Sequence, residues 1–588
     1  MNGEMNVTTN GTPTANPVYF ERLPATSAEL DVSTWDALKP YYDELEGRAD
    51  AGEPVESWVT DWSRLLELVY EAGSLLSIRY NQDTEDEGKR DAFLHYVKEV
   101  SPHVQTANQK LNRRLLDSGW STASMREPLR HLRADDELFR DENVPLLAEE
   151  RATGTRYGEI VGSLTVEFDG EERTIAGLAP YREAPDRATR EAAWRAGHER
   201  MLQVRGDLDD LFDELLPLRV RIAANAGYEN YRDYKWKQLG RFDYTAADAV
   251  RFQEAIADVV VPALARQAAR RAEALGLETL RPWDLDVDPH ADAPLRPFET
   301  ADELSGKAAA IFDRVDPELG AMVRTMRDED LLDLDNRKGK APGGYCATLS
   351  ARGRPFIFMN AVGTEDNVRT MLHESGHAFH VFESAGLPLI WERHAPMEFA
   401  EVASMSMELL SAPYIDVGHG GFYGAREAAR SRLQHFERMI TFLPYMATVD
   451  AFQHWLYANP DHTRDARDEH WLALHERFNV AADWSGLEDS RRSLWQHKLH
   501  IFEVPFYYIE YGLAQLGALQ VWRNSLADAA KATRDYRAAL ALGGTRSLSE
   551  LYRAAGARLV FDAAGLAEIV AGVEGEIASL RRQLDEGA

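Results

Sequence analysis

Apolar residues recur at three- and four-residue spacings over most of the chain, which is the pattern of amphipathic helices. Trp62, Leu65 and Val69 give one example, because all three side chains fall on the same helical face. The stretches for which this spacing predicts helices are about 35–150, 186–280 and 364–585. The sequence therefore predicts a mainly α fold.

Two short segments interrupt the helical pattern and predict β-hairpins. The first, 163–176, contains Asp169-Gly170, a dipeptide typical of a tight turn between paired strands. The second, 344–360, reverses direction around 351–354. We expect both segments to be small β insertions in a helical body.

Composition suggests how the chain is divided. Residues 1–20 are polar and rich in Asn, Thr, Gly and Pro, so we expect a flexible N-terminal tail. Residues 21–195 are expected to form an N-terminal helical lobe that carries the hairpin near 163–176. The remaining residues, 196–588, hold the candidate chemistry.

The charge balance of the 588-residue chain is strongly acidic. Asp and Glu number 97 against 66 Lys and Arg, for a formal net charge of −31. Because nucleic-acid binding normally requires a basic surface, this balance argues against a nucleic-acid partner. The chain begins without the basic and apolar stretches of a signal peptide, and no segment approaches the roughly 20 apolar residues that span a bilayer. We expect a cytoplasmic protein that does not bind membranes.

The candidate chemistry begins with His373, Glu374 and His377, in a segment whose apolar residues repeat at helical spacing. Imidazoles four residues apart lie on the same side of a helix, within reach of one metal ion. Glu374 projects beside the pair, where its carboxylate could take a proton from metal-activated water. Thr364 is expected to cap this helix. The alternative is a helix that carries two surface histidines.

A second predicted helix, 396–410, carries an acidic stripe. Glu398, Glu401 and Glu408 share a face that is separate from the apolar face. Catalytic zinc is commonly held by two His and one Glu, and a buried carboxylate is costly unless it is paired or metal-bound. Glu401 lies 24 residues after His377, which leaves room for a turn and a returning antiparallel helix. The alternative is an acidic face in solvent.

A third segment, 497–518, holds His500 and three tyrosines. Tyr507, Tyr508 and Tyr511 occupy about one helical turn. An enzyme that attacks an amide needs hydrogen-bond donors where the carbonyl oxygen gains negative charge, and tyrosine hydroxyls or a histidine can supply them. Aromatic residues at this spacing are also typical of a helix that packs in a core.

Weaker signals surround the single cysteine. Gly343 and Gly344 before Tyr345 would let a strand edge lie close to a ligand, so that an extended peptide could pair with that edge. Cys346 is expected to be a small buried residue rather than a nucleophile, because no neighbouring base marks it. One cysteine also excludes an intramolecular disulfide and a cysteine-based zinc site.

Five separated segments give the chain a resemblance to a known family. They are Arg337–Cys346, Pro355–Asn360, His373–His380, Phe399–Ser404 and Pro505–Tyr511. In this order the segments resemble those of the thimet oligopeptidase and oligoendopeptidase F family of zinc metallopeptidases, and are most similar to the oligoendopeptidase F branch. The resemblance runs from about 160 to 530.

The resemblance implies a large multi-helical, clam-shaped, zincin-like body with a deep channel that admits short peptides. The metallopeptidase catalytic region would be 196–588. By analogy with the family, one zinc ion per chain would be held by His373, His377 and Glu401, with Glu374 as the general base. The expected activity is cleavage of internal bonds in oligopeptides, by a monomer.

The same resemblance implies roles for residues around the ligands. His500 and the tyrosines of 507–511 would stabilise the oxyanion, and the choice among Tyr507, Tyr508 and Tyr511 stays open because their spacing differs between branches. Glu408 would orient a ligand imidazole, and we expect His380 nearby in the same supporting role.

Two other functions fit parts of the pattern. A helical zinc carboxypeptidase of the carboxypeptidase Taq type also carries His-Glu-x-Gly-His, although Phe399–Ser404 differs from the His-Glu-Ser-rich signature of that group. A helical peptide-binding or scaffold protein that has lost its activity is disfavoured, because Glu374 accompanies three candidate ligands. Co²⁺ or Mn²⁺ could occupy the same ligands as zinc.

Overall fold

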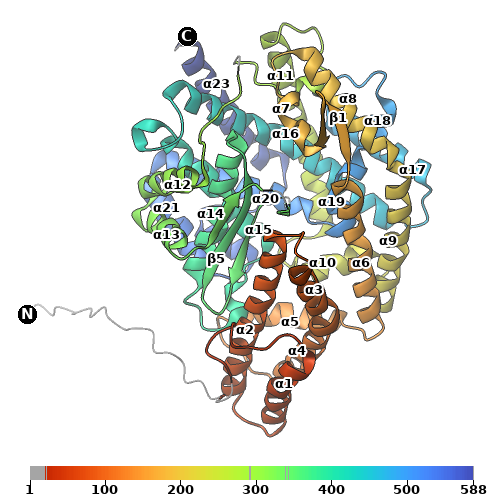
Figure 1. Ribbon diagram of the computed structural model, residues 1–588, viewed down its shortest axis with the longest axis vertical. Coiled ribbons are helices and arrows are strands. Elements are labelled where there is room, and N and C mark those ends of the chain that lie inside the picture. Colours follow the sequence, from red (N-terminus) through yellow and green to blue (C-terminus); the bar gives the residue numbers. More distant parts are fainter. Residues whose placement is uncertain (1–19, 21–22, 291–292, 338, 342, 587–588) are drawn as a thin grey trace, which may run out of the picture. The chain divides into compact units, whose positions relative to one another are not determined.

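The computed structural model describes the chain in five parts, namely residues 20, 23–290, 293–337, 339–341 and 343–586. These residues are mainly helical, which confirms the predicted fold class (Figure 1). They form two compact units. The first comprises the chain up to Trp120 with Leu349–Arg352 and Pro388–Trp391, and the second comprises the remainder. The predicted tail lies outside the described residues except for Phe20, which is fully buried. The domain division at 195 stays a prediction.

The first unit is built on four long helices, which are α1 (Trp35–Asp50), α2 (Val55–Gln82), α3 (Glu87–His95) and α4 (Ser101–Asp117). The Thr34 side chain caps α1 by accepting a hydrogen bond from the N–H of Ala37 at 3.3 Å. The predicted apolar face of α2, with Trp62, Leu65 and Val69, is buried. Burial of this face explains why the three- and four-residue spacing is present.

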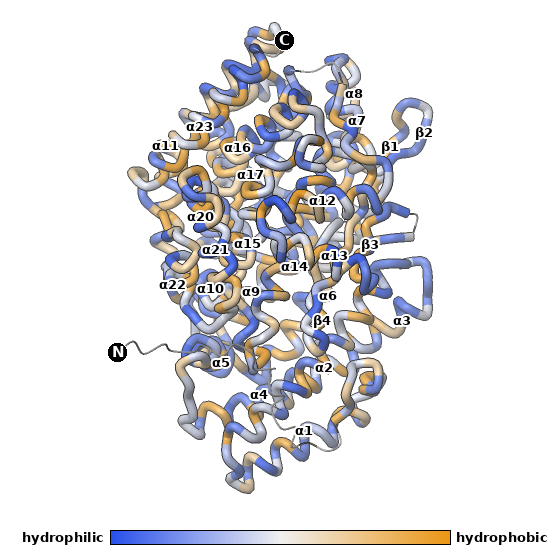
Figure 2. The backbone as a smooth tube through the Cα atoms, turned by 90° about the vertical axis from the view of Figure 1, so that its left-hand side faces the viewer, coloured by the Kyte–Doolittle hydropathy of each residue, from blue (hydrophilic) through white to orange (hydrophobic). Residues whose placement is uncertain are grey.

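The second unit contains the other helices. They are α5 (Arg126–Leu138), α6 (Asn143–Gly162), α7 (Ala179–Arg182), α8 (Arg187–Gln203), α9 (Arg205–Asn225), α10 (Tyr231–Gln238), α11 (Ala246–Ala274), α12 (Ala301–Val315), α13 (Pro317–Asp328), α14 (Glu365–Ser384), α15 (Met397–Ser411), α16 (Ala425–Ala458), α17 (Arg464–Phe478), α18 (Glu488–Arg492), α19 (Leu499–Glu503), α20 (Tyr508–Ala527), α21 (Ala529–Leu540), α22 (Leu548–Ala554) and α23 (Ala563–Glu586). Polar and apolar stretches alternate along helices such as α11 and α23 (Figure 2). Among the residues described, no helix combines the length and apolar composition needed to cross a membrane.

The first predicted hairpin is confirmed. Strands β1 (Thr165–Phe168) and β2 (Glu171–Thr174) pair in antiparallel register. Asp169 and Gly170 connect them with φ angles of +55° and +76°. Two consecutive positive φ angles are the mark of a type I′ turn, whose twist matches that of the strands.

The second predicted hairpin is part of a larger sheet. Strands β4 (Tyr345–Leu349) and β5 (Arg354–Ala361) lie next to each other, and β3 (Leu332–Asp335) pairs in parallel with the other edge of β5. The sequence did not predict β3, because a four-residue strand after a helix is too short to show a period. β5 is the central strand and packs against α14.

Two glycines bring the helices of the candidate site together. α15 packs against both α14 and α20. A Cβ atom on Gly376 of α14 would lie 2.5 Å from the carbonyl oxygen of Ala403 on α15. On the other side, a Cβ atom on Gly517 of α20 would lie 2.7 Å from Val402. The absence of a side chain at both positions therefore sets the distance at which α15 lies from its neighbours.

Candidate metal centre

The first two candidate ligands come from the middle of α14. Thr364 is the N-cap residue, as predicted, and its N–H donates to the side-chain oxygen of Asn367 at 3.2 Å. Val368 and Met371 face the core, which fixes the helix rotation. His373 and His377 then lie one turn apart, with ring centroids separated by 5.1 Å and side chains 21% exposed.

Glu401 on α15 completes a cluster of three potential metal ligands. Its Oε2 atom lies 3.5 Å from His373 Nε2 and 3.8 Å from His377 Nε2. One ligand atom from each residue lies within 4.8 Å of the others. Ligand atoms held about 2.0–2.1 Å from zinc at tetrahedral angles are about 3.3–3.4 Å apart, so the donor set and its spacing fit this ion. This geometry argues against the alternative of a helix that carries two unrelated surface histidines.

The acidic stripe of α15 is buried rather than solvated. Glu398 and Glu401 are 3% and 4% exposed. Glu401 accepts hydrogen bonds from the Tyr507 hydroxyl at 3.1 Å and from Ser404 Oγ at 3.2 Å. Burial acts to raise the pKa of Glu401, but the hydrogen bond from His373 and the charges nearby outweigh it and lower that pKa. Glu401 is therefore ionised and able to bind a cation.

Glu408 bridges two histidines, about two helical turns after Glu401 on α15. One oxygen lies 2.8 Å from His373 Nδ1 and the other lies 2.9 Å from His435 Nε2. These histidines lower the pKa of Glu408 despite its burial. A carboxylate on Nδ1 fixes the ring so that Nε2 faces Glu401. His435, on α16, was not predicted, because a lone histidine in a long helix gives no motif.

The two candidate ligand histidines differ in protonation. Burial acts to lower the pKa of His373, but Glu401 and Glu408 outweigh it and raise that pKa well above its ordinary value. The two carboxylates thus favour a proton on His373, which a metal bound at Nε2 would displace while the Nδ1–H stays on Glu408. Burial lowers the pKa of His377 to about 4, so this ring is neutral near pH 7 and its lone pair is available to a metal.

Glu374 lies beside the cluster with a carboxyl group that is 7% exposed. Its Oε2 atom has no hydrogen-bond partner among the described residues. Burial raises the pKa of Glu374 to about 7. A carboxyl group with this pKa and a free oxygen can take up and return a proton near neutral pH.

The three predicted tyrosines lie together around His500, whose ring centroid is 5.0 Å from that of Tyr508, but their hydroxyls have different partners. Tyr507 donates to Glu401, and its ring centroid lies 5.2 Å from that of Tyr511. His500 lies 5.9 Å from both rings. Tyr508 instead accepts a hydrogen bond from Lys498 Nζ at 3.2 Å. Burial raises the pKa of all three tyrosines, so their hydroxyls remain donors.

An unpredicted set of buried groups holds the chain just before Tyr507. Phe506 has a φ of +65°, in the left-handed region that L-residues rarely adopt. Its N–H donates to Gln453 Oε1 at 2.7 Å, and its carbonyl accepts from Arg241 Nη2 at 2.5 Å. Arg241 is completely buried and also contacts Glu510 at 2.9 Å. No sequence motif marks this arrangement, because its members lie on three distant segments.

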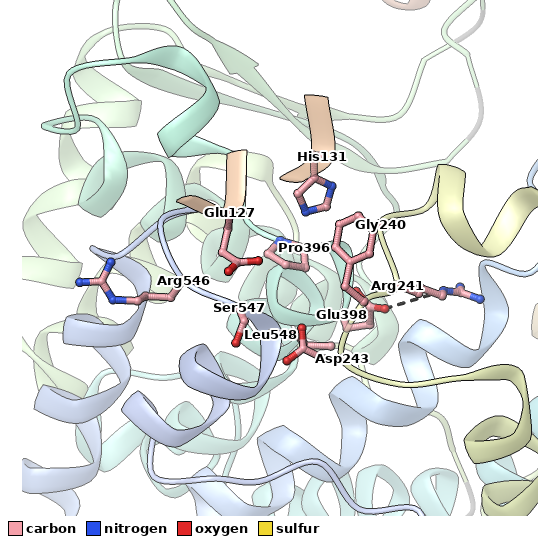
Figure 3. Close-up of a pocket in the computed structure, with 11 residues that line it drawn as sticks. Glu127, His131, Gly240, Arg241, Asp243, Pro396, Glu398, Arg546, Ser547 and Leu548 are labelled. Atoms are coloured by element: carbon pink, nitrogen blue, oxygen red, sulfur yellow. Dashed lines mark ion pairs between the residues drawn. The ribbon is translucent and has the colours of Figure 1, made fainter. Parts of the chain in front are cut away.

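Arg241 also connects this set with the acidic stripe. Its Nε atom lies 3.8 Å from Glu398 Oε1, and Glu398 accepts from the Tyr244 hydroxyl at 2.7 Å. Figure 3 shows Arg241 and Glu398 among the residues that line a small pocket, with their ion pair dashed. The charge of Glu398 is thus balanced within the protein by Arg241. Unlike Glu401, Glu398 is not turned toward the histidines.

Other predicted residues lie outside the cluster. Gly343 has a φ of +97°, and Tyr345 stacks on Phe358 at 5.0 Å at the start of the edge strand β4. Gly344 precedes that strand, with Phe358 O at 3.4 Å from where a Cβ would be. His380 packs its ring against Phe399 at 5.9 Å, and its Nε2 has no partner in the described structure. The substrate contact predicted for Gly343, Gly344 and Tyr345 and the supporting role predicted for His380 remain predictions.

Cys346 is half-buried on β4. Burial raises the pKa of its thiol well above the ordinary value, and Glu374 adds to the shift. The thiol therefore stays protonated, as expected of a cysteine that is not a nucleophile.

Known proteins share these features of sequence and fold. Residues 181–571 match peptidase family M3, and residues 27–128 match the peptidase M3 N-terminal domain. The first match covers most of the chain and contains every member of the metal cluster. The chain belongs to peptidase family M3. Its mainly α fold and the predicted oligoendopeptidase F branch are thereby confirmed.

Individual M3 relatives support this placement. A structure of PZ peptidase A with inhibitor 2 is 28% identical, with a TM-score of 0.86 over 94% of this chain and 99% of that chain. A structure assigned to oligoendopeptidase F is 29% identical, with the same TM-score and coverage. The group B oligopeptidase PepB of Streptococcus agalactiae serotype III (strain NEM316) is 29% identical over 149 residues, which are 25% of this chain and 24% of PepB. The match thus spans about a quarter of that relative's length.

Proposed function

We propose that this peptidase family M3 chain is a zinc-dependent endopeptidase that cleaves internal bonds of short oligopeptides. The observation that carries the proposal is the convergence of His373, His377 and Glu401 beside Glu374, whose Oε2 atom has no hydrogen-bond partner in the described structure. Two imidazoles and one carboxylate leave a fourth position open on a tetrahedral ion, as catalytic zinc sites require. The described residues hold one such cluster, from which we propose one zinc ion per chain.

A zinc ion held by these ligands would supply a Lewis acid that acidifies water and polarises a carbonyl group. Glu408 would keep the ring of His373 oriented toward the ion. Glu374 would accept a proton from the attacking water and return it to the leaving amine, for which a pKa of about 7 is suited.

Hydrogen-bond donors for the oxyanion would come from one side of the tyrosine cluster. Tyr507 already points its hydroxyl at Glu401, and Tyr511 lies next to it. His500 is neutral near pH 7, because burial lowers its pKa to about 4, and can donate from one ring nitrogen. Tyr508 is turned to Lys498, so we assign the oxyanion role to Tyr507, Tyr511 and His500.

The family relationship supports short peptides as substrates. An extended peptide could pair with the free edge of β4, where Gly343, Gly344 and Tyr345 lie. A channel that excludes folded proteins, a monomeric state and a cytoplasmic location complete the proposal. The net charge of −31 disfavours a nucleic-acid partner.

The test is hydrolysis of an internally quenched peptide that is blocked at both ends, with and without a zinc chelator. Mass spectrometry of the products locates the cut. We expect internal cleavage that the chelator abolishes. Cleavage that continues in chelator would overturn the metal mechanism. Trimming of an unblocked peptide from its C-terminus, without cleavage of the blocked one, would favour the carboxypeptidase alternative.

A further inference from the structure

Lys498 is a half-buried cation beside the tyrosine cluster. It lies between the 3-10 turn η7 (Leu494–His497) and α19. Its Nζ atom lies 4.8 Å from the ring centroid of Tyr508 and 5.3 Å from that of Tyr445. The two rings shield the ammonium from water while leaving it attractive to an anion.

The ammonium has no negative partner within the described chain. Its one hydrogen bond goes to the neutral hydroxyl of Tyr508, at 3.2 Å, and no carboxylate oxygen there lies within 4.0 Å. An ammonium has three donors, so two remain free. Burial lowers the pKa of Lys498 to about 8, with no carboxylate to offset it. A half-buried charge loses part of its hydration and gains no ion pair here in return, so the site suits an anion supplied from outside the chain.

A continuous series of contacts joins this cation to the candidate metal centre. Tyr507 donates to Glu401 at 3.1 Å, and the ring centroids of Tyr507 and Tyr511 are 5.2 Å apart. Tyr511 lies 5.7 Å from Tyr508, which binds Lys498. A peptide whose carbonyl oxygen meets Tyr507 and Tyr511 would thus place a nearby group at Lys498.

We propose that Lys498 binds a carboxylate of the peptide substrate and that this contact helps to select the bond that is cut. The inference rests on the proposed peptidase function. An ammonium binds a carboxylate by charge-assisted hydrogen bonds, and the free donors beside Tyr508 can make them. The carboxylate comes either from the C-terminus of the peptide or from an Asp or Glu side chain, and both sources offer the same chemistry.

The experiment compares three kinds of peptide, all blocked at the N-terminus. The first two share one sequence and end either in a free carboxylate or in an amide. The third kind is a set of amide-ended peptides of the same sequence in which Glu replaces one residue at successive positions. For the unsubstituted protein we expect kcat/KM to be about tenfold to a hundredfold higher for a carboxylate-bearing peptide than for the plain amide. Lys498→Met should remove this preference by slowing only the carboxylate-bearing peptide.

Matched variants separate the charge from general damage. Lys498→Arg keeps the charge and should retain part of the preference. Lys531→Met removes a lysine that is 63% exposed and paired with Asp535. This variant should retain the full preference for carboxylate-bearing peptides. The inference is overturned if Lys498→Met keeps the full preference, or if the unsubstituted protein cleaves all three kinds of peptide equally.

A binding measurement distinguishes failure of this inference from failure of the proposed function. Calorimetry with the Glu374→Gln protein and the free-acid and amide peptides reports affinity without turnover. Tighter binding of the acid, lost on Lys498→Met, would support the site even if no peptide were hydrolysed. Equal binding of the free-acid, amide and Glu-bearing peptides by the Glu374→Gln protein, when the unsubstituted protein does cleave peptides, would overturn the inference alone.

Discussion

The Nη2 atom of Arg241 donates a hydrogen bond of 2.5 Å to the carbonyl oxygen of Phe506, the residue directly before Tyr507. A bulky residue with a φ of +65° is strained and persists only where its surroundings hold it. Gln453 holds the other side of the same residue through the N–H. The strained residue thus fixes the position from which Tyr507 reaches Glu401, which links a buried arginine to the candidate oxyanion site.

Replacing Arg241 should damage both stability and turnover. Arg241→Met leaves Glu510 buried without its partner, which should lower the free energy of unfolding by about 3–5 kcal/mol. The released Phe506 carbonyl should lower kcat by about tenfold or more with little change in KM, because misplaced catalytic groups lose transition-state contacts. Denaturant unfolding and steady-state kinetics measure the two effects.

The double variant Arg241→Met with Glu510→Met is the control for this prediction. Replacing both charges of a buried pair by apolar groups is often neutral, so stability should recover in part, since Glu398 still loses its ion pair with Arg241. Activity should not recover, since Phe506 is still unheld. A double variant with full kcat would show that the arginine serves only the stability of the fold.

Replacing the proposed general base should separate chemistry from metal binding. Glu374→Gln should lower kcat by about 10²–10⁴-fold, the range that a positioned acid–base group supplies. Zinc content should remain one per chain, because Glu374 is not among the clustered ligand atoms. Asp366→Asn on the same helix, where Asp366 is 69% exposed, serves as the control and should leave both quantities unchanged. Near-native activity of Glu374→Gln would refute the proposed role.

Removing the carboxylate that holds His373 should weaken the metal. Glu408→Ala frees His373 Nδ1 and His435 Nε2, so we expect zinc affinity to fall by about 10–100-fold. Competition with a chelator of known affinity measures the change. Glu408→Gln, which can still accept a hydrogen bond, should lose less. Equal affinities in all three proteins would mean that Glu408 does not orient the ligand.

Adding a methyl group between α14 and α15 should push the ligands apart. Gly376→Ala places its Cβ 2.5 Å from the backbone of Ala403 and Ser404. We expect a loss of about 1–3 kcal/mol in unfolding free energy, together with weaker zinc binding. Gly386→Ala, whose Cβ would meet nothing within 4 Å, is the matched control. If the two variants bind zinc equally, the helix contact does not set the ligand spacing.

The parts of the site that the sequence could predict are those carried by local spacing. His373 and His377 share a helical face whatever the tertiary structure, and Asp169-Gly170 specifies its own turn. Glu401 needed an assumption about how two helices pack, which its spacing from His377 and the family resemblance supplied. The mainly α class likewise followed from periodicity alone.

The parts that could not be predicted depend on contacts between distant segments. His435 reaches Glu408 only because α16 passes beside α15. Arg241 meets Phe506 from the segment between α10 and α11 and Gln453 meets it from α16, and no residue pattern predicts a positive φ at a phenylalanine. The short strand β3 becomes recognisable only through its pairing with β5. The role of each of these residues and of this strand depends on contacts that exist only in the folded protein.

The central claim is that a single metal at His373, His377 and Glu401 drives internal cleavage. The most direct test is to strip the protein of metal and titrate zinc back while following hydrolysis of a peptide blocked at both ends. The account predicts activity that rises in proportion to zinc and reaches its maximum at one equivalent, with Glu401→Gln failing to respond. Full hydrolysis by the metal-free protein would contradict it.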